Sequence, residues 1–183
     1  LKDSLGKQVL PSTCKLVENP HRLRAGASRL FDSEGLATKK REILSKGVLT
    51  GWTLDLASAR KLGMKPTANA SRSVSSTSSP TNWNIELSSP KDYCDNLLSE
   101  MRNGLLVTSL IGSTINPNTG DYSRGVSGFW VEDGQICYPV SEITIAGNLR
   151  DMLKTIILGN DAQRHLSYVV PSILVEDMTL AGS

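Results

Sequence analysis

The spacing of apolar and polar residues predicts β-strands in several parts of the chain. Residues 82–87, NWNIEL, alternate so that the apolar side chains fall on one face and the polar side chains on the other. Residues 105–111, LLVTSLI, form a short aliphatic run, which is typical of a buried strand. Residues 168–180 predict one or two further strands, bent at Pro171.

Two pairs of apolar runs are joined by glycine-containing dipeptides, which is typical of β-hairpins. The dipeptide Lys46-Gly47 joins residues 41–44 to 48–54, and Asp133-Gly134 joins residues 126–132 to 135–140. We therefore predict two antiparallel hairpins.

Capping residues predict three helices. Gly63 would end the first helix, Pro90 would occupy the first position of the second, and Gly159 would close the third. The predicted caps and helices are Asp55 before residues 56–62, Ser89 before residues 90–103, and Asn148 before residues 149–158.

Hairpins with helices inserted between them indicate an α+β fold, with a mainly antiparallel sheet built from hairpins. The length of the chain suits a single domain over residues 1–183. Residues 67–80 are rich in serine and have few large apolar side chains, so we expect a mobile loop. Such a loop can also carry recognition, and the sequence leaves that alternative open.

Composition and charge exclude some classes of function. The net charge of +2 indicates no concentrated basic surface, so nucleic-acid binding is not expected. No apolar run is long enough to cross a bilayer. The three cysteines, Cys14, Cys94 and Cys137, are widely spaced and fit a reducing compartment, so we expect a cytoplasmic protein. The chain begins without Met, and we expect a longer protein from which the N-terminal part is absent.

Motifs for catalysis are missing from the sequence. There is no HExxH helix, no GxSxG turn and no glycine-rich phosphate loop, and the cysteines lack the short spacing of a zinc site. The two histidines, His21 and His165, are separated by most of the chain. We therefore expect no catalytic residue, no metal ligand and no cofactor in this chain.

Residues 116–148 are the best candidate for a functional surface, because an Asn/Pro/Gly/Asp loop predicted at residues 116–125 precedes the second predicted hairpin. Arg124 could bind a ligand carboxylate through two parallel hydrogen bonds, or it could form an ion pair with Asp121. The predicted peptide- or partner-binding residues are Asn116, Asp121, Tyr122, Ser123, Arg124, Gly125, Trp130 and Glu142.

Two further interpretations concern the same stretch. Trp130 follows Phe129, so one ring lies on each side of a strand; we expect one in the core and the other at an interface. Asp121 and Glu142 could form a carboxylate pair, although we favour a turn-forming Asp and a strand-end Glu as the explanation.

Four phrases of the sequence resemble the C-terminal domain of the TldD/PmbA family, in its PmbA/TldE branch, and the resemblance extends over essentially the whole chain. They are FDSEGLATKKREILSKGVLTGWTLDLASARKLG at 31–63, GLLVTSLIG at 104–112, NPNTGDYSRGVSGFWVEDGQICYPVSEITIAGNLRDML at 116–153 and LVEDMTLAGS at 174–183.

The resemblance implies that two subunits with different roles act together. In this family a TldD-type subunit supplies an HExxxH helix and further zinc ligands, including a cysteine before its last strands. A PmbA/TldE-type subunit pairs with it without a working metal site, and together they cleave unfolded peptides. The residue nearest to that cysteine here is Val170, which has no lone pair for zinc. We therefore expect zinc in a TldD-type partner, unfolded peptides as substrates, and a homo- or hetero-oligomer.

Two other functions stay open. The complete protein could itself be a metallopeptidase whose ligands precede Leu1, and stoichiometric zinc in the full-length protein would support that function. The family's older description as modulators of DNA gyrase implies a module that binds gyrase or DNA, which salt-dependent DNA binding would support.

Overall fold

The computed structural model describes residues 2–89 and 93–182, which form two compact units. Unit 1 contains Leu1–Gln8, Ser12–Lys91 and Ala162–Pro171, and unit 2 contains Val9–Pro11, Asp92–Asp161 and Ser172–Ser183. Strands outnumber helices in the described residues, and all but two of the strand pairs are antiparallel, which confirms the α+β class. A single domain stays a prediction.

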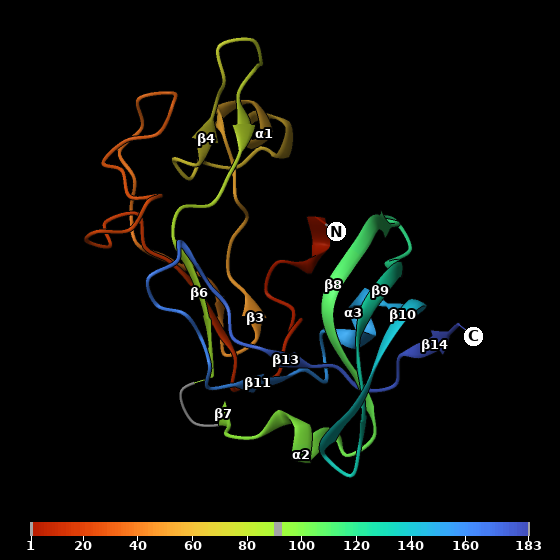
Figure 1. Ribbon diagram of the computed structural model, residues 1–183. Helices are drawn as coiled ribbons and strands as arrows, with labels where there is room; N and C mark the ends of the chain where they lie inside the picture. The colour runs from red at the N-terminus through yellow and green to blue at the C-terminus, as the bar shows by residue number, and fades with distance from the viewer. Residues whose placement is uncertain (1, 90–92, 183) are drawn as a thin grey trace. The chain divides into compact units, whose positions relative to one another are not determined.

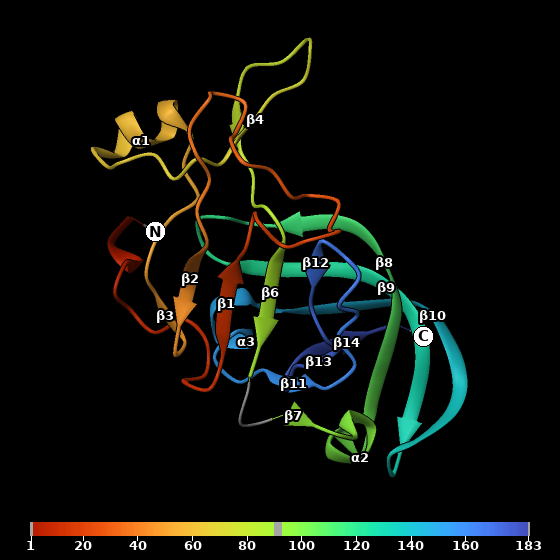
Figure 2. The same ribbon diagram turned by 90° about the vertical axis from the view of Figure 1, so that its left-hand side faces the viewer.

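Unit 1 is built on a five-stranded sheet with the order β12-β6-β1-β2-β3 (Figure 2). Only β12 is parallel to its neighbour in this sheet. A short 3-10 helix, η1 (Lys2–Ser4), precedes the sheet. The strands are β1 (Lys15–Glu18), β2 (Arg41–Ser45), β3 (Val48–Leu49), β6 (Ile85–Ser88) and β12 (Tyr168–Val169).

The predicted hairpin at Lys46-Gly47 is confirmed, and both turn residues have positive φ angles, 50° and 74°. Its returning strand is shorter than predicted and ends at Leu49. The reason lies in Arg41, whose guanidinium donates to the carbonyl of Trp52 over 2.8 Å and to the hydroxyl of Thr53 over 3.1 Å. A side chain thus replaces the strand-to-strand hydrogen bonds there.

Helix α1 (Leu56–Leu62) confirms both predicted caps. Asp55 accepts a hydrogen bond from the backbone N–H of Ser58 over 2.7 Å, and Gly63 ends the helix in the left-handed conformation with φ of 65°.

The serine-rich segment is more ordered at its ends than predicted. Strands β4 (Ala70–Ser71) and β5 (Ser79–Pro80) pair as a short hairpin, so a loop over all of residues 67–80 is wrong. Asn69 and Ala70 are fully buried. The amide of Asn69 donates to Glu18 over 2.7 Å, and such a distant partner is invisible in the local composition.

The core of unit 1 contains a buried carboxylate, Glu18, which is 1% exposed. It accepts from Nε of Arg41 over 2.6 Å, from the amide of Asn69 over 2.7 Å and from the backbone N–H of Trp83 over 2.6 Å. Arg29 lies over the indole of Trp83, 3.7 Å from the ring centroid. These contacts connect β1 and β2 to the segments before β4 and β6.

The strand predicted at residues 82–87 begins later, at Ile85, because Asn84 has a positive φ of 47°. Trp83 and Leu87 are buried, as the alternation predicted, and Ile85 is half-buried.

Unit 2 contains a four-stranded antiparallel sheet with the order β14-β10-β9-β8, whose three long strands curve strongly (Figure 1). The strands are β8 (Gly104–Ile115), β9 (Asp121–Glu132), β10 (Gln135–Asn148) and β14 (Thr179–Ala181). The Asp133-Gly134 hairpin is confirmed, with φ angles of 48° and 75°. Strand β8 is exposed at Leu110 and Ile111, so its prediction as a buried strand is wrong there.

A three-stranded sheet, β13-β11-β7, completes unit 2. Its strands are β7 (Tyr93–Cys94), β11 (Ile157–Gly159) and β13 (Ile173–Leu174), and the helices of this unit are α2 (Leu97–Met101) and α3 (Leu149–Met152). No helix among the described residues is long and apolar enough to span a membrane.

Two predicted helices are therefore shorter than expected. Helix α2 is capped by Asn96 rather than Ser89, and Pro90 lies outside the described residues. Asn148 caps α3 as predicted, but residues 157–159 form a strand. Strand β11 pairs with β7 and with β13, both far away in the sequence, and this pairing overrides the local helical spacing.

Residues 168–180 contribute three short strands, one to each of three sheets, rather than one or two strands. Pro171 is buried and stands between β12 and β13, where the chain leaves unit 1.

Candidate functional site

The loop predicted at residues 116–125 is wrong beyond Gly120, because residues 121–125 belong to β9 and pair with β8 and β10. Residues 116–120 form a tight turn between β8 and β9, and they mainly bind one another. The backbone N–H of Asn116 donates to the carbonyl of Asp121 over 2.9 Å, and that of Gly120 donates to the carbonyl of Asn116 over 2.8 Å. The side-chain oxygen of Asn116 accepts from the backbone N–H groups of Asn118 and Thr119. The role of Asn116 is thus to shape the turn.

Hydrogen bonds of Asn148 and Arg150, which together we call the clasp, connect this turn to the end of β10. Its side-chain amide donates to the carbonyl of Thr119 over 3.1 Å, while its side-chain oxygen accepts from the backbone N–H of Arg150 over 3.1 Å. The guanidinium of Arg150 donates to the carbonyl of Asn118 over 3.1 Å. The carboxylate of Asp121 accepts from the hydroxyl of Thr119 over 2.6 Å. The polar side chains of Thr119, Asn148 and Arg150 are therefore satisfied within the chain.

The two charge pairs considered for this stretch are wrong. Asp121 and Arg124 are three residues apart on β9, which places them on opposite faces, and Arg124 donates instead to the carbonyl of Gly112. Asp121 pairs with Asn148 in the sheet, six residues along β10 from Glu142, or about 20 Å at 3.3 Å per residue. Glu142 has a φ of 58° within a bulge of β10.

The other predicted residues lie along β9. Trp130 is half-buried and donates from its indole N–H to Glu132 over 3.0 Å, while Phe129 is 36% exposed, so neither ring lies in the core. Ser123 and Gly125 are mid-strand positions opposite Ala146 and Thr144. Their binding role stays a prediction.

Unit 2 contains an open groove of about 960 Å³, which we call the unit 2 groove. Of the predicted residues only Tyr122 lines it. Most of the lining comes from residues that the sequence analysis assigned to core strands and helices, in segments that meet only through long-range pairing. Apart from glycines and asparagines, the residues that line the groove are Cys94, Asp95, Leu97, Leu98, Glu100, Met101, Leu105, Leu106, Val107, Leu110, Tyr122, Ile145, Met152, Asp161, Ser172, Ile173, Leu174, Val175, Glu176, Asp177, Met178 and Leu180.

Strand β8 borders this groove and forms the edge of the four-stranded sheet. No described strand pairs with its outer side. Its 12 residues, GLLVTSLIGSTI, include no charged residue and no proline. Natural proteins usually protect long edge strands with such residues, because an open edge can accept another chain. The edge of β8 is therefore suited to pairing with an extended chain.

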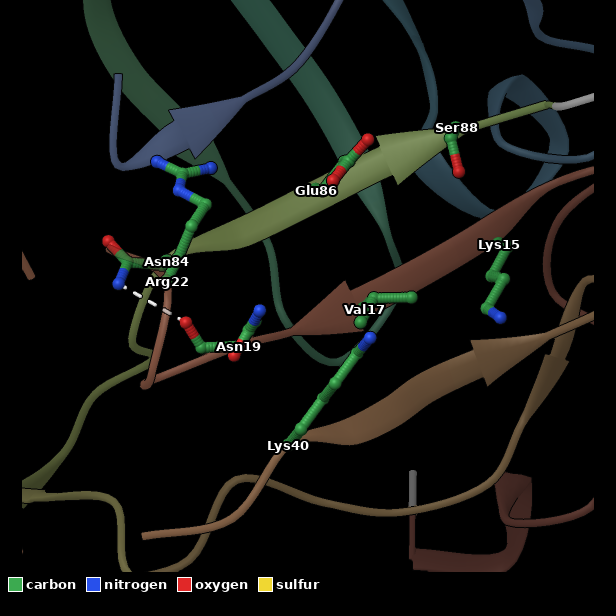
Figure 3. A pocket seen from close by; sticks show the side chains of 8 residues that line it. All are labelled: Lys15, Val17, Asn19, Arg22, Lys40, Asn84, Glu86 and Ser88. Atoms are coloured by element: carbon green, nitrogen blue, oxygen red, sulfur yellow. Dashed lines mark hydrogen bonds between the residues drawn. The ribbon is translucent and has the colours of Figure 1, made fainter. Parts of the chain in front are cut away.

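Unit 1 contains a smaller pocket of about 240 Å³ on the face of its sheet (Figure 3). Several of its polar side chains already have partners: Lys15 forms an ion pair with Glu42, Arg22 donates to the carbonyl of Leu166, and Asn84 donates to the carbonyl of Asn19. The pocket is lined by Lys15, Val17, Asn19, Arg22, Lys40, Asn84, Glu86 and Ser88.

The two units differ in charge, which the net charge of the whole chain conceals. Unit 1 contains sixteen Lys and Arg against seven Asp and Glu, a formal charge of +9. Unit 2 contains four Lys and Arg against eleven Asp and Glu, a formal charge of −7. The total of +2 is therefore the sum of two large opposite charges, and the lack of a basic surface concentrated on one face stays a prediction.

Side chains that could bind a metal are scattered. Within residues 2–89 and 93–182, no group of three His, Cys, Asp or Glu side chains lies close enough to hold an ion. His21 makes a 3.0 Å hydrogen bond with the hydroxyl of Thr38. Val170, at the position where the resemblance implies a cysteine in the catalytic branch, directly follows β12 and is exposed. The described residues do not fit a zinc site.

The chain is similar to proteins that are named as PmbA or as its homologues. The chain is 47% identical over 183 residues to the metalloprotease PmbA of Escherichia coli O157:H7, and 45% identical over 184 residues to a PmbA homologue of Haemophilus influenzae. Both alignments cover all of this chain but only 39% of the relative, so the chain spans about two fifths of the length of these proteins.

Two crystal structures share the fold. A protein from Bacteroides thetaiotaomicron, described as a candidate modulator of DNA gyrase, superposes with a TM-score of 0.84 at 31% identity, over 99% of this chain and 39% of that one. TldE from Thermococcus kodakarensis superposes with a TM-score of 0.80 at 22% identity, over 98% of this chain and 42% of that one.

A family model described as the PmbA/TldA metallopeptidase C-terminal domain matches residues 1–182. This match covers nearly the whole chain and agrees with the named relatives. The chain therefore belongs to the PmbA/TldA metallopeptidase family, as a C-terminal domain.

Proposed function

We propose that this chain is the C-terminal part of a subunit that holds peptide substrates for a TldD-type zinc peptidase, and that the TldD-type partner supplies the metal. Family membership and relatives named as metalloproteases support a role in proteolysis. Val170 supports the assisting role, since valine cannot ligate zinc. The protein would act in the cytoplasm, as part of a hetero-oligomer.

The open edge of β8 beside the unit 2 groove carries this proposal. An extended peptide that adds to a sheet edge forms main-chain hydrogen bonds whatever its sequence. Side-chain pockets beside that edge then discriminate among peptides. Unfolded substrates, which share only a backbone, suit such a surface. In this role the subunit binds and orients the chain that the partner cleaves.

Copurification with a TldD-type subunit tests the proposal. The full-length protein that contains this chain should co-elute with the partner at micromolar concentration, and hydrolysis of unfolded peptides should require both subunits. Separate elution would contradict the proposal. Stoichiometric zinc in the full-length protein alone would support instead the alternative in which that protein is itself a metallopeptidase.

A second candidate function, binding of nucleic acid, is favoured by the formal charge of +9 on unit 1. A basic unit can neutralise phosphates, and its affinity then falls steeply with salt. Fluorescence anisotropy with a short DNA duplex at 50 mM and 150 mM salt tests this candidate. Salt-sensitive binding that persists at 150 mM would support it, and no binding at that concentration would remove it.

A further inference from the structure

We infer that the unit 2 groove selects extended peptides that combine apolar side chains with lysine or arginine, and that it disfavours acidic peptides. This inference rests on the proposed function and names the class of peptide that the same site accepts. Three observations carry it: the apolar floor of the groove, the sign of the charges around it, and the open strand edge beside it.

The floor of the groove is apolar but incompletely covered. Ile145 is buried, whereas Leu105 and Tyr122 are half-buried, and Leu110 and Leu180 are 47% and 39% exposed. Alternate side chains of a peptide strand point to the same face of a sheet. A chain paired with β8 would thus direct every second side chain toward this floor, where burial of apolar surface favours binding.

The charges along the groove all have one sign. Among the described residues that line it, five are carboxylates and none is Lys, Arg or His. All five carboxylates are exposed: Asp95, Glu100, Asp161, Glu176 and Asp177. The groove also lies in the unit with a formal charge of −7. Like charges that line one cleft reinforce one another and attract ligands of opposite sign.

The basic side chains of unit 2 do not neutralise these carboxylates. Arg124 donates to the carbonyl of Gly112, and Arg150 donates to the carbonyl of Asn118. Lys154 forms an ion pair with Asp151 over 2.9 Å. None of these three residues, nor Arg102, lines the groove. Cations from a bound chain would therefore provide the missing complement.

Two of the carboxylates are held in place. Asp95 accepts from the side-chain amide of Asn160 over 2.7 Å, and Asp161 accepts from the hydroxyl and the backbone N–H of Ser172 over 2.5 Å and 2.7 Å. The other three have exposed side chains, and Glu176 and Asp177 are adjacent. Asp95 and Asp161 therefore offer negative charges at fixed positions to the lysine or arginine side chains of a peptide.

Direct binding measurements on the full chain test the inference. The probes are three fluorescein-labelled nine-residue peptides that alternate leucine with lysine, with serine or with glutamate, measured by fluorescence anisotropy at 150 mM salt. The lysine peptide should bind at least tenfold more tightly than the glutamate peptide, with the serine peptide between them. The double variant Glu176→Gln with Asp177→Asn should weaken binding of the lysine peptide at least threefold.

Matched control variants separate the groove from the general charge of unit 2. Glu132→Gln with Asp133→Asn removes the same pair of residue types outside the groove. Asp133 and Asp177 both have positive φ angles, 48° and 57°, which asparagine also adopts readily. Leu110 on β8 lines the groove, whereas Ile136 on β10 does not, although the two side chains are similarly exposed, at 47% and 51%. Leu110→Ser should weaken binding of the lysine peptide at least threefold, whereas the control double variant and Ile136→Ser should leave it unchanged.

Several results would overturn the inference. Equal binding of the serine and lysine peptides would do so while leaving the proposed function intact, since co-elution with a TldD-type partner is measured separately. Absence of binding by all three peptides, or equal effects of the groove variants and their controls, would also overturn it. Light scattering provides the last check: a dimer that Glu176→Gln with Asp177→Asn dissociates would identify a second copy as the occupant of the groove.

Discussion

The side-chain amide of Asn148 donates a hydrogen bond to the backbone carbonyl of Thr119 over 3.1 Å, although the two residues are 29 positions apart. The same asparagine caps α3 through its side-chain oxygen. Beside it, the backbone N–H of Leu149 donates to the carbonyl of Gly120 over 2.7 Å. The idiosyncratic sequence of residues 116–148 thus reflects a structural clasp at one end of the long sheet.

Replacement of Asn148 by Ala should destabilise the protein by about 1–2 kcal/mol, because it removes both a helix cap and a side-chain hydrogen bond. Urea unfolding measures the change. Asn118→Ala is the matched control, since Asn118 takes part in the clasp through its backbone carbonyl. An equal loss in the two variants would contradict the role assigned to Asn148.

Gly128 allows a close approach between β8 and β9. A Cβ at this position would lie 1.9 Å from the carbonyl oxygen of Leu106, so Gly128→Ala should cost about 1–3 kcal/mol or more through strain. In the same strand a Cβ at Gly125 would make an ordinary 3.6 Å contact with Ile111. Gly125→Ala should therefore be neutral or slightly stabilising. Thermal unfolding compares the two variants, and a larger loss in Gly125→Ala would refute the argument.

The ion pair between Glu18 and Arg41 should show strong coupling. Removal of either partner leaves a charge in the core of unit 1, at a cost of about 3–5 kcal/mol. A double-mutant cycle with Glu18→Ala and Arg41→Met should give a double variant that is less destabilised than the sum of the single variants, by about 0.5–3 kcal/mol. Strict additivity in urea unfolding would mean that the two side chains act independently.

Local signals in the sequence predict local features of the fold well. Lys46-Gly47 and Asp133-Gly134 form the hairpin turns, and Asp55 and Asn148 cap helices, because each feature depends on residues within a few positions. Features set by distant partners are not predictable in this way. Residues 157–159 have helical spacing but form a strand, because β7 and β13 pair with them.

The candidate site also combines features that depend on neighbouring residues with features that depend on distant ones. The sequence pattern points to the polar residues of the 116–125 stretch, but Asn116 and Asp121 act mainly within the turn. The unit 2 groove was missed because its apolar residues have the same pattern as core residues. Only the tertiary arrangement leaves Leu110 and Leu180 exposed. The opposite charges of the two units were likewise hidden, because both units draw on residues from distant parts of the chain.

The cap of α1 predicts a dependence of stability on pH. The hydrogen bond from the backbone N–H of Ser58 holds the pKa of Asp55 below its ordinary value, with a further contribution from the Ser58 hydroxyl. A lowered pKa in the folded state means that Asp55 stabilises the fold above the unfolded-state pKa of about 3.9, and that this stabilisation is lost as the pH falls through the folded-state pKa.

At pH 7, Asp55→Ala should therefore cost about 1 kcal/mol, and the difference from the unmodified protein should shrink as the pH falls below about 4. Urea unfolding at a series of pH values measures it. Asp55→Asn is the matched control, because it keeps a capping oxygen that does not titrate. A cost of Asp55→Ala that stays constant down to pH 3 would refute the prediction.

Pairing of a peptide with the open edge of β8 predicts that binding depends on the peptide backbone. The outer side of β8 has no described partner strand, and main-chain groups provide the hydrogen bonds in such an addition. A nine-residue leucine–lysine peptide and its two analogues, each N-methylated on one of the two alternate sets of residues, have the same side chains and charge. Methylation on the residues whose N–H groups face β8 removes those donors, so one of the two alternate patterns should weaken binding at least tenfold. The other pattern, whose methyl groups face solvent, should bind nearly as well as the parent.

Fluorescence anisotropy compares all three peptides. Equal affinities would show that the groove holds side chains without strand addition, because the edge would then contribute no backbone hydrogen bonds.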